Sequence, residues 1–344
     1  MPKPSRGTLA LLLALVVTPA VACARQTGAV SPAAIAALLD SLSSDAMLGR
    51  QTGSEGSRQA AEIISRRMRA AGLTPAGDRE YFQTIPLARA DSRRVVLVMD
   101  RSALDSFPAD RRLVGGNAVG VLPGNDPALR DEVVLVTAHY DHIGVRQPVN
   151  GDSINNGADD NASGTVAMLE VARLLAATGG TRRTLVFVAF TGEELGGLGT
   201  RWYLQHPTRP LDKTVANLNI EMIGRPDSLA GGPGRAWLTG YERSTMGDGL
   251  AAAGIPIVPD PRPDQNFFRR SDNYAFALQG IPAHTLSSFN LHSDYHRPSD
   301  EAALADPDHM AQVIEATARA VRLLGDGPTP SWKAGGRPEP RRAP

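Results

Sequence analysis

The stretch Val133–Ala138 reads VVLVTA, and the stretch Thr184–Phe190 reads TLVFVAF. Both runs are continuously apolar and rich in β-branched residues, which is typical of strands that are buried on both faces of a sheet. Ala216–Met222 and Ile281–Leu286 are predicted as a third and a fourth strand. Because stretches with helical periodicity alternate with these runs, the pattern predicts a sheet of mainly parallel strands.

Helical segments lie on both sides of these strands in the sequence. Helices are predicted over residues 31–43, 54–71, 162–177 and 308–324, and further strands over 95–99 and 119–122. The last helix has a start signal in Asp306-Pro307. The expected fold class is therefore α/β, a three-layer sandwich with helices around a mixed, mainly parallel central sheet.

The composition favours one catalytic or binding domain over residues 25–325. The chain has 344 residues, is 42% hydrophobic, and balances 36 Lys+Arg against 36 Asp+Glu. This neutral balance gives no electrostatic case for a nucleic-acid partner.

The segment Pro256–Arg270 is Pro-rich and predicts a long loop near the mouth of a site, with Phe267 and Phe268 as candidates to line it. Residues 326–344 are rich in Pro, Gly and Arg, so we expect a disordered tail.

The N-terminal 24 residues resemble an export signal. Lys3 and Arg6 precede the apolar run Leu9–Val17, and small residues follow at 20–24. This layout predicts a signal peptide and hence a periplasmic or secreted protein. Cys23, the only cysteine, is either incidental or the lipidated first residue of a membrane-anchored bacterial lipoprotein. No later apolar run reaches about 18 residues, so no transmembrane span is expected in the mature chain.

The single cysteine also excludes some chemistry. A mature chain without a second cysteine has no internal disulfide, no Cys-ligated zinc site and no cysteine nucleophile. Candidate ligands are therefore histidines and carboxylates. In open α/β sheets, ligands bind outside the carboxyl ends of the strands, and polar clusters follow the predicted strands here.

The first two clusters are AHYDH at 138–142 and GADDNASG at 157–164. A zinc-ligating histidine usually donates its second ring N–H to a carboxylate, which Asp141 can supply to His139. We interpret His142 as structural or as the partner of a ligand. Asp160 lies between a glycine and a helix start, where it can bridge two cations. Its alternative role is a helix cap, which Asn161 fills equally well.

The remaining clusters contain acids whose charge needs compensation. Glu193 and Glu194 directly follow an apolar strand and repel each other unless a cation is present. One of them can bind a metal while the other accepts a proton. Glu221, between Ile220 and Met222, is costly to bury unless it is paired or metal-bound. The last cluster, residues 291–300, contains Tyr295 and His296; its alternative interpretation is a polar loop.

Five motifs in a fixed order carry a resemblance to a known family. They are A-H-Y-D-H, G-A-D-D-N-A-S-G, T-G-E-E, N-x-E-M-I-G-R and Y-H-R-P-S-D. In this order they resemble the co-catalytic zinc exopeptidases, metallopeptidase family twenty-eight. That family includes secreted leucine-type aminopeptidases, plasma glutamate carboxypeptidase and prostate-specific membrane antigen. The resemblance runs from about Asn117 to Leu324.

The resemblance implies two zinc ions and a role for each matching residue. The implied metal ligands are His139 and Glu221 for one zinc, Glu194 and His296 for the other, and Asp160 as the bridge. Glu193 would be the general base, Asp141 would orient His139, and Tyr295 would stabilise the oxyanion. Two features depart from the family: Glu221 stands where several relatives carry Asp, and Phe82–Leu113 is too short for a full protease-associated domain.

The expected function is an exported di-zinc aminopeptidase that acts on peptide substrates. A dipeptidase, a carboxypeptidase-type enzyme and a glutaminyl cyclase of the same fold stay open, although cyclases use one zinc and the bridging set here is complete. A non-catalytic binding domain is the alternative outside enzymes. A serine hydrolase is disfavoured because no G-x-S-x-G elbow follows a strand. The zincin motif H-E-x-x-H is also absent from the sequence.

Overall fold

The computed structural model describes Met1 and residues 29–91 and 94–339. The predicted signal peptide and Cys23 lie outside the described residues. Within the described residues, no helix is both long and apolar enough to cross a membrane.

Ten of the described strands form one mixed sheet. In spatial order these are β11 (Ile257–Pro259), β10 (Ala236–Leu238), β12 (Ala283–Ser287), β9 (Thr214–Ile220), β5 (Val133–His139), β8 (Thr184–Phe190), β4 (Arg112–Leu122), β2 (Phe82–Arg89) and β3 (Val95–Leu97), with β1 (Thr74–Pro75) paired to β4. The four central strands β12, β9, β5 and β8 are parallel, whereas β4, β2 and β3 are antiparallel. The structure confirms the predicted mixed sheet with its parallel centre.

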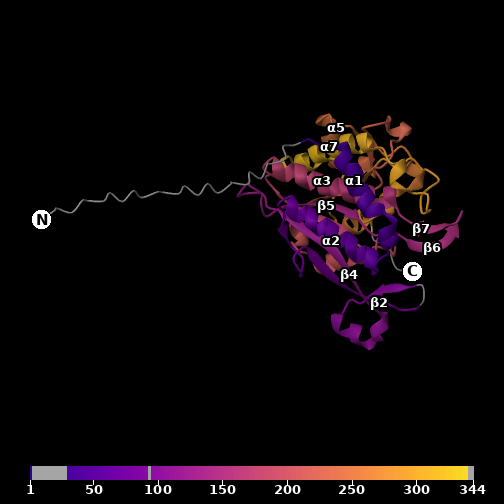
Figure 1. Cartoon of the computed structure of the whole chain (residues 1–344). Helices are drawn as coiled ribbons and strands as arrows, with labels where there is room; N and C mark the ends of the chain where they lie inside the picture. Colours follow the sequence, from indigo (N-terminus) through magenta and orange to yellow (C-terminus); the bar gives the residue numbers. More distant parts are fainter. Residues whose placement is uncertain (2–28, 92–93, 340–344) are drawn as a thin grey trace.

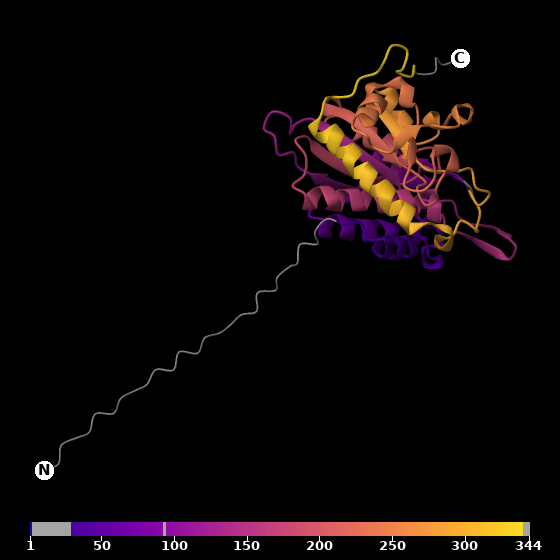
Figure 2. The same ribbon diagram turned by 90° about the horizontal axis from the view of Figure 1, so that it is seen from above.

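Helices cover both faces of this sheet (Figures 1 and 2). The helices are α1 (Pro32–Ser43), α2 (Glu55–Ala70), α3 (Gly164–Ala177), α4 (Leu198–Gln205), α5 (Thr245–Ala252), α6 (Asn273–Leu278) and α7 (Pro307–Asp326). Apolar residues of α1, α2, α3 and α7 share one large core with the sheet, and residues of α4 and α6 pack in separate clusters with its strands. The result is the expected three-layer sandwich.

The buried strands β5 and β8 coincide with the apolar runs that predicted them. Every residue of β5 and of β8 is buried, because helices lie against both faces. The two strands pair in parallel register from Val133–Thr184 to His139–Phe190, so their carboxyl ends lie level. This register brings the residues that follow the strands to one edge.

Four segments differ from what the sequence analysis predicted. The segment 256–270 is not a continuous loop, because it contains β11 and two short 3-10 helices. The strand β2 and the hairpin of β6 (Gly144–Val149) and β7 (Asp152–Asn155) were not predicted. The predicted disorder is wrong for residues 326–339: Trp332 bridges to Ser244 and donates its indole N–H to the oxygen of Gly280 at 2.8 Å. The indole thus fixes this tail on the domain, a long-range contact that local composition does not reveal.

Candidate metal centre

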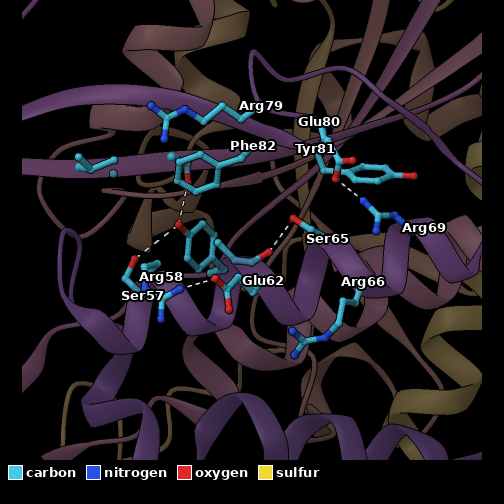
Figure 3. A pocket seen from close by; sticks show the side chains of 15 residues that line it. Ser57, Arg58, Glu62, Ser65, Arg66, Arg69, Arg79, Glu80, Tyr81 and Phe82 are labelled. Carbon is cyan, nitrogen blue, oxygen red and sulfur yellow. Dashed lines mark hydrogen bonds and ion pairs between the residues drawn. The ribbon is translucent and has the colours of Figure 1, made fainter.

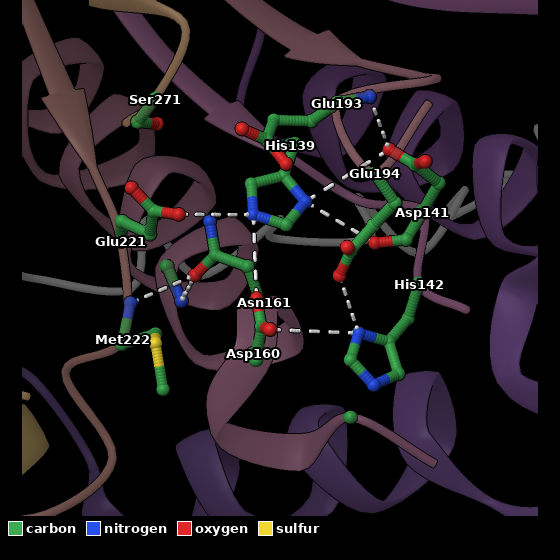
Figure 4. Close-up of polar contacts among 12 residues, drawn as sticks. His139, Asp141, His142, Asp160, Asn161, Glu193, Glu194, Glu221, Met222 and Ser271 are labelled. Carbon is green, nitrogen blue, oxygen red and sulfur yellow. Dashed lines mark hydrogen bonds and ion pairs between the residues drawn. The ribbon is translucent and has the colours of Figure 1, made fainter. Parts of the chain in front are cut away.

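Four candidate side chains follow the carboxyl ends of three neighbouring parallel strands. His139 ends β5, Glu193 and Glu194 follow β8, and Glu221 follows β9. Because β5 lies between β8 and β9, His139 lies between the two sets of acids (Figure 4). Gly192 adopts a φ of 76°, a conformation that glycine reaches without strain, and so turns the chain sharply before Glu193.

Asp160 and His296 reach the same place from two loops. Asp160 lies in the irregular turn Ala158–Ser163 before α3. The carboxylate of Asp300 accepts the N–H groups of Asp159 and Asp160 at 3.1 and 3.0 Å and thereby fixes this turn. The ring of His296 stacks on Tyr295 with a centroid distance of 3.9 Å.

These residues form two groups that share Asp160. In the first, His139 Nε2 lies 3.4 Å from Asp160 Oδ1 and 3.4 Å from Glu221 Oε1. In the second, His296 Nε2 lies 3.0 Å from Asp160 Oδ2 and 3.2 Å from Glu194 Oε2. Asp160 therefore turns a different oxygen towards each group, which is the arrangement that a bridging carboxylate needs.

Unpaired polar atoms show that these residues fit a metal. His139 Nε2, Asp160 Oδ2 and Glu194 Oε1 are buried and have no hydrogen-bond partner in the part of the chain that the structure describes. Each such atom costs about 1–3 kcal/mol if it stays unpaired. The ligand atoms of each group lie within 4.8 Å of one another, so one cation could satisfy a whole group. Imidazole nitrogen and carboxylate oxygen are donors that zinc accepts.

His142, which was predicted to be structural or the partner of a ligand, also belongs to this cluster. Its ring is buried, and its Nδ1 lies 2.9 Å from Glu194 Oε1 and 3.7 Å from Asp160 Oδ2. The structure thus brings together all the residues that the motifs indicated and one histidine more.

Comparison with known proteins agrees with this geometry. Residues 117–321 match the profile of Peptidase family M28. The chain belongs to this family. It is 38% identical over 155 residues to Aminopeptidase YwaD of Bacillus subtilis (strain 168), covering 44% of this chain and 31% of the relative. It is 35% identical over 111 residues to Leucine aminopeptidase 1 of Trichophyton equinum, covering 31% of this chain and 28% of that one.

The solved structures show the same fold. The zinc aminopeptidase BSAP of Bacillus subtilis superposes with a TM-score of 0.61 at 18% identity, covering 87% of this chain and 96% of that chain. The curated relatives are longer, and this chain spans about a third of their length. The resemblance seen in the motifs is therefore confirmed for the family and the fold.

The electrostatics of the M28 site follow from burial and close pairing. Burial alone would raise the pKa of Asp160, but His139 and His296 lower it well below its usual value. Burial alone would lower the pKa of His296, but Asp160 and Glu194 raise it to about 10. These shifts show that the histidines and carboxylates are packed directly against one another, and both are donor types that zinc binds.

Glu193 differs from the other acids. Burial raises its pKa well above the usual value of a glutamate, and the acids Glu221, Asp272 and Glu194 raise it further, while His139 opposes the shift. A carboxylate with raised proton affinity is suited to accept a proton near neutral pH. Its main-chain N–H donates to Asp141 Oδ1 at 3.2 Å, which fixes the position of Glu193 relative to the loop after β5.

Asp141 connects three parts of the site. Its Oδ2 accepts the Thr52 hydroxyl at 2.8 Å, and its Oδ1 accepts the N–H of Glu193. His139 Nδ1 lies 3.2 Å from the main-chain oxygen of Asp141 and 3.8 Å from its Oδ1. The nearer acceptor for His139 Nδ1 is thus the main-chain oxygen of Asp141, while the Asp141 carboxylate holds the main chain of Glu193.

Sequence reasoning missed Arg50, which is fully buried beside the site. Its Nε donates to the oxygen of Tyr140 at 2.8 Å, and its Nη2 donates to that of Gly157 at 2.8 Å. Its Nη1 donates to the oxygens of Leu42 and Asn156 at 2.7 and 2.6 Å. One guanidinium therefore ties the loop after β5 to the loop that carries Asp160.

A small cavity of about 40 Å³ lies beside Glu221. Its walls include Trp237, Phe267, Phe289 and Arg270. Phe267 thus lines a cavity at the site, whereas Phe268 packs in a separate core with Tyr203 and Phe276.

A larger cavity of about 400 Å³ lies between α2 and the Tyr81–Phe82 segment (Figure 3). Arginines of α2 rim it, and Tyr140 is the wall residue nearest in sequence to the candidate ligands. None of the candidate metal ligands lines this cavity, whereas Glu221 lines the smaller one.

Proposed function

We propose that this M28 chain is a zinc aminopeptidase that uses two metal ions. The observation that carries the proposal is Asp160, which turns one oxygen towards each of two ligand groups beside Glu193. Two relatives, 38% identical over 155 residues and 35% identical over 111 residues, are named aminopeptidases. The donor set of histidine and carboxylate supports zinc.

Zinc bound by these residues would supply a Lewis acid that polarises the scissile carbonyl and lowers the pKa of the attacking water. Glu193 accepts the proton of that water and passes it to the leaving amine, a role that its raised pKa favours. Burial, then the carboxylates of Asp160 and Glu194, raise the pKa of Tyr295. Its phenol therefore stays protonated and donates a hydrogen bond to the developing oxyanion.

The surroundings of Glu221 support attack at the first peptide bond of a substrate. The cavity of about 40 Å³ beside this residue has aromatic side chains among its walls and has room for one small side chain. Glu193 and Glu221 offer carboxylates to a nearby ammonium group. A substrate bound by its first side chain and its free amine presents its N-terminal peptide bond to the metal ligands.

We extend the proposal to export. It rests on the basic residues, apolar run and small residues within positions 1–24 of the sequence. In the alternative form of this proposal, Cys23 is lipidated and the exported enzyme stays anchored to a membrane.

The test is a matched set of substrates on protein purified without tag-derived metal. We expect cleavage of aminoacyl and free peptides, no cleavage of N-blocked peptides, and loss of activity in chelator. Metal analysis should give two zinc ions per chain. Cleavage of blocked substrates alone would defeat the aminopeptidase proposal, and cyclisation of N-terminal glutamine with one zinc would indicate a cyclase.

A further inference from the structure

His142 and His296 both lie close to the carboxylates of Asp160 and Glu194. Its Nδ1 is 2.9 Å from Glu194 Oε1 and 3.7 Å from Asp160 Oδ2, and His296 Nε2 is 3.2 Å from Glu194 Oε2 and 3.0 Å from Asp160 Oδ2. Figure 4 shows the His142 ring turned towards these acids from the loop after β5. The two imidazoles approach edge to face with centroids 5.5 Å apart. They therefore flank one shared position.

The short contact between His142 and Glu194 does not have the geometry of a hydrogen bond. Across the described ranges, neither His142 Nδ1 nor Glu194 Oε1 has a hydrogen-bond partner, although the two atoms lie 2.9 Å apart. Two polar atoms that lie close together without the geometry of a hydrogen bond can both be directed at a third atom, such as a bound metal ion. His139 Nε2, assigned as a ligand on independent grounds, is unpaired in the same way.

The backbone leaves the His142 ring little freedom to move away. A Cβ atom on Gly157 would lie 2.5 Å from the ring's Cγ and Cδ2, so the main chain of the Asp160 loop runs directly against the imidazole. Arg50 holds that loop through the oxygen of Gly157 and holds the His142 loop through the oxygen of Tyr140. The ring is thus clamped in the position from which Nδ1 faces the carboxylates.

We propose that His142, through Nδ1, is a fourth protein ligand of the metal position formed by Asp160, Glu194 and His296. The proposal rests on the metal centre of the proposed function. Four donors fill a tetrahedral zinc shell, whereas the His139 position has three and keeps room for water or substrate. The two positions should therefore differ in affinity, and the position that contains His142 should fill first.

His142 lacks one feature of most histidine ligands. Its Nε2 is buried and has no hydrogen-bond acceptor among residues 29–91 and 94–339. A second-nitrogen acceptor usually raises the basicity of a ligand. We therefore expect loss of His142 to weaken metal binding less than loss of His296.

The first test counts histidines on the unmutated chain. X-ray absorption of the protein loaded with two equivalents of zinc reports the imidazole ligands per ion. We expect three histidines over two ions, an average of one and a half. An average of one would leave only His139 and His296 as ligands and would overturn the proposal. Protein that binds no zinc would instead refute the proposed function.

The second test uses His142→Asn. The asparagine amide can still donate a hydrogen bond to Glu194, but it is a poor zinc ligand. Calorimetric titration of the chelated protein should show more than about 100-fold weaker binding at one position, beyond the roughly 10–100-fold that loss of an outer partner costs. The visible absorption of the cobalt(II) form should change as well. A loss of affinity of about 100-fold or less with an unchanged cobalt spectrum would reduce His142 to a partner of Glu194.

His309→Asn is the matched control. His309 is also buried, but its Nδ1 accepts the N–H of Gly234 and its Nε2 contacts the Ser288 hydroxyl, each at 2.9 Å. This variant should lose stability and keep both metal positions. His296→Ala removes a ligand that the family motifs imply. The zinc affinity of this variant is the reference for complete loss of one metal position.

Discussion

The two ends of the central strands β5, β8 and β9 bury charge in different ways. At the amino ends, Arg183 is 4% exposed and pairs with Glu132 at 2.6 Å and with the main-chain oxygens of Leu324 and Gly327. At the carboxyl ends, Arg50 is fully buried and donates only to main-chain oxygens. Both arginines therefore fix loops across the fold.

The difference lies in what surrounds each arginine. Arg183 and Glu132 leave no buried side-chain atom unpaired in the described structure, whereas the site beside Arg50 leaves atoms of His139, His142 and Glu194 without partners. A buried arginine therefore serves a structural role at both ends of these strands. What distinguishes the candidate metal centre is that unpaired histidine and carboxylate atoms gather there, with the possible ligand atoms of each group within 4.8 Å of one another.

The largest effect should come from Glu193→Gln at the carboxyl ends. The amide keeps the shape of the side chain but cannot accept the proton, so kcat/KM should fall by up to about 10⁴-fold. Zinc content should stay near that of wild type, because Glu193 is assigned as the base and not as a ligand. Steady-state kinetics and metal analysis on the same preparation check both statements.

Glu132→Gln is the same substitution at the amino ends and should leave kcat/KM unchanged. A Glu193→Gln enzyme that stays active would remove Glu193 from the mechanism. A variant that loses zinc would make Glu193 a ligand.

The sequence was sufficient for the centre of the sheet but not for its edges. Apolar runs as long as β5 and β8 predict buried strands, and the polar residues after them mark the active edge. The three-residue strands β10 and β11 are too short to show a period, so their pairing had to come from tertiary packing. Trp332 ordered the tail through a contact with Gly280, 52 residues away.

The same limit applies within the site. The motifs named the residues that lie together, because all of them except His296, which lies in a loop, end or follow a strand or precede a helix. They could not show Arg50, whose partners Tyr140 and Gly157 lie 90 and 107 residues along the chain. Nor could they show the direction of the His142 ring, which depends on how the Gly157 loop packs against it.

Arg50→Met and Arg183→Met should lower the free energy of unfolding by similar amounts, about 2–4 kcal/mol each, because each leaves buried oxygens without a donor. Only Arg50→Met should also weaken zinc binding, since it releases the loops of His142 and Asp160. Denaturant unfolding of the metal-free proteins gives the first quantity, and zinc titration gives the second.

Arg50→Lys sharpens this comparison, because lysine keeps the charge but lacks the planar fork that reaches several oxygens at once. It should recover little of the zinc affinity. Equal zinc affinity in both methionine variants would show that Arg50 has only the structural role of Arg183.

The smallest effect concerns His284 in β12, a buried histidine that contrasts with His142. Its Nδ1–H donates to the oxygen of Thr239 at 2.7 Å, and its Nε2 accepts the Ser244 hydroxyl at 2.7 Å. Burial lowers the pKa of His284 to about 4. Both nitrogens are satisfied only in the neutral ring, so this histidine is held uncharged.

The pH dependence follows from the direction of that shift. Between about pH 6.5 and pH 4 the unfolded chain binds a proton at His284 that the folded chain does not, so stability falls as the pH is lowered. From pH 7 to pH 5 this site should cost about 2 kcal/mol. His284→Asn should be less stable at pH 7, because one hydrogen bond is lost, yet its unfolding free energy should fall by about 2 kcal/mol less over the same interval. Denaturant unfolding of zinc-loaded wild type and variant at both pH values measures the difference, and parallel curves would show that His284 does not set the acid sensitivity.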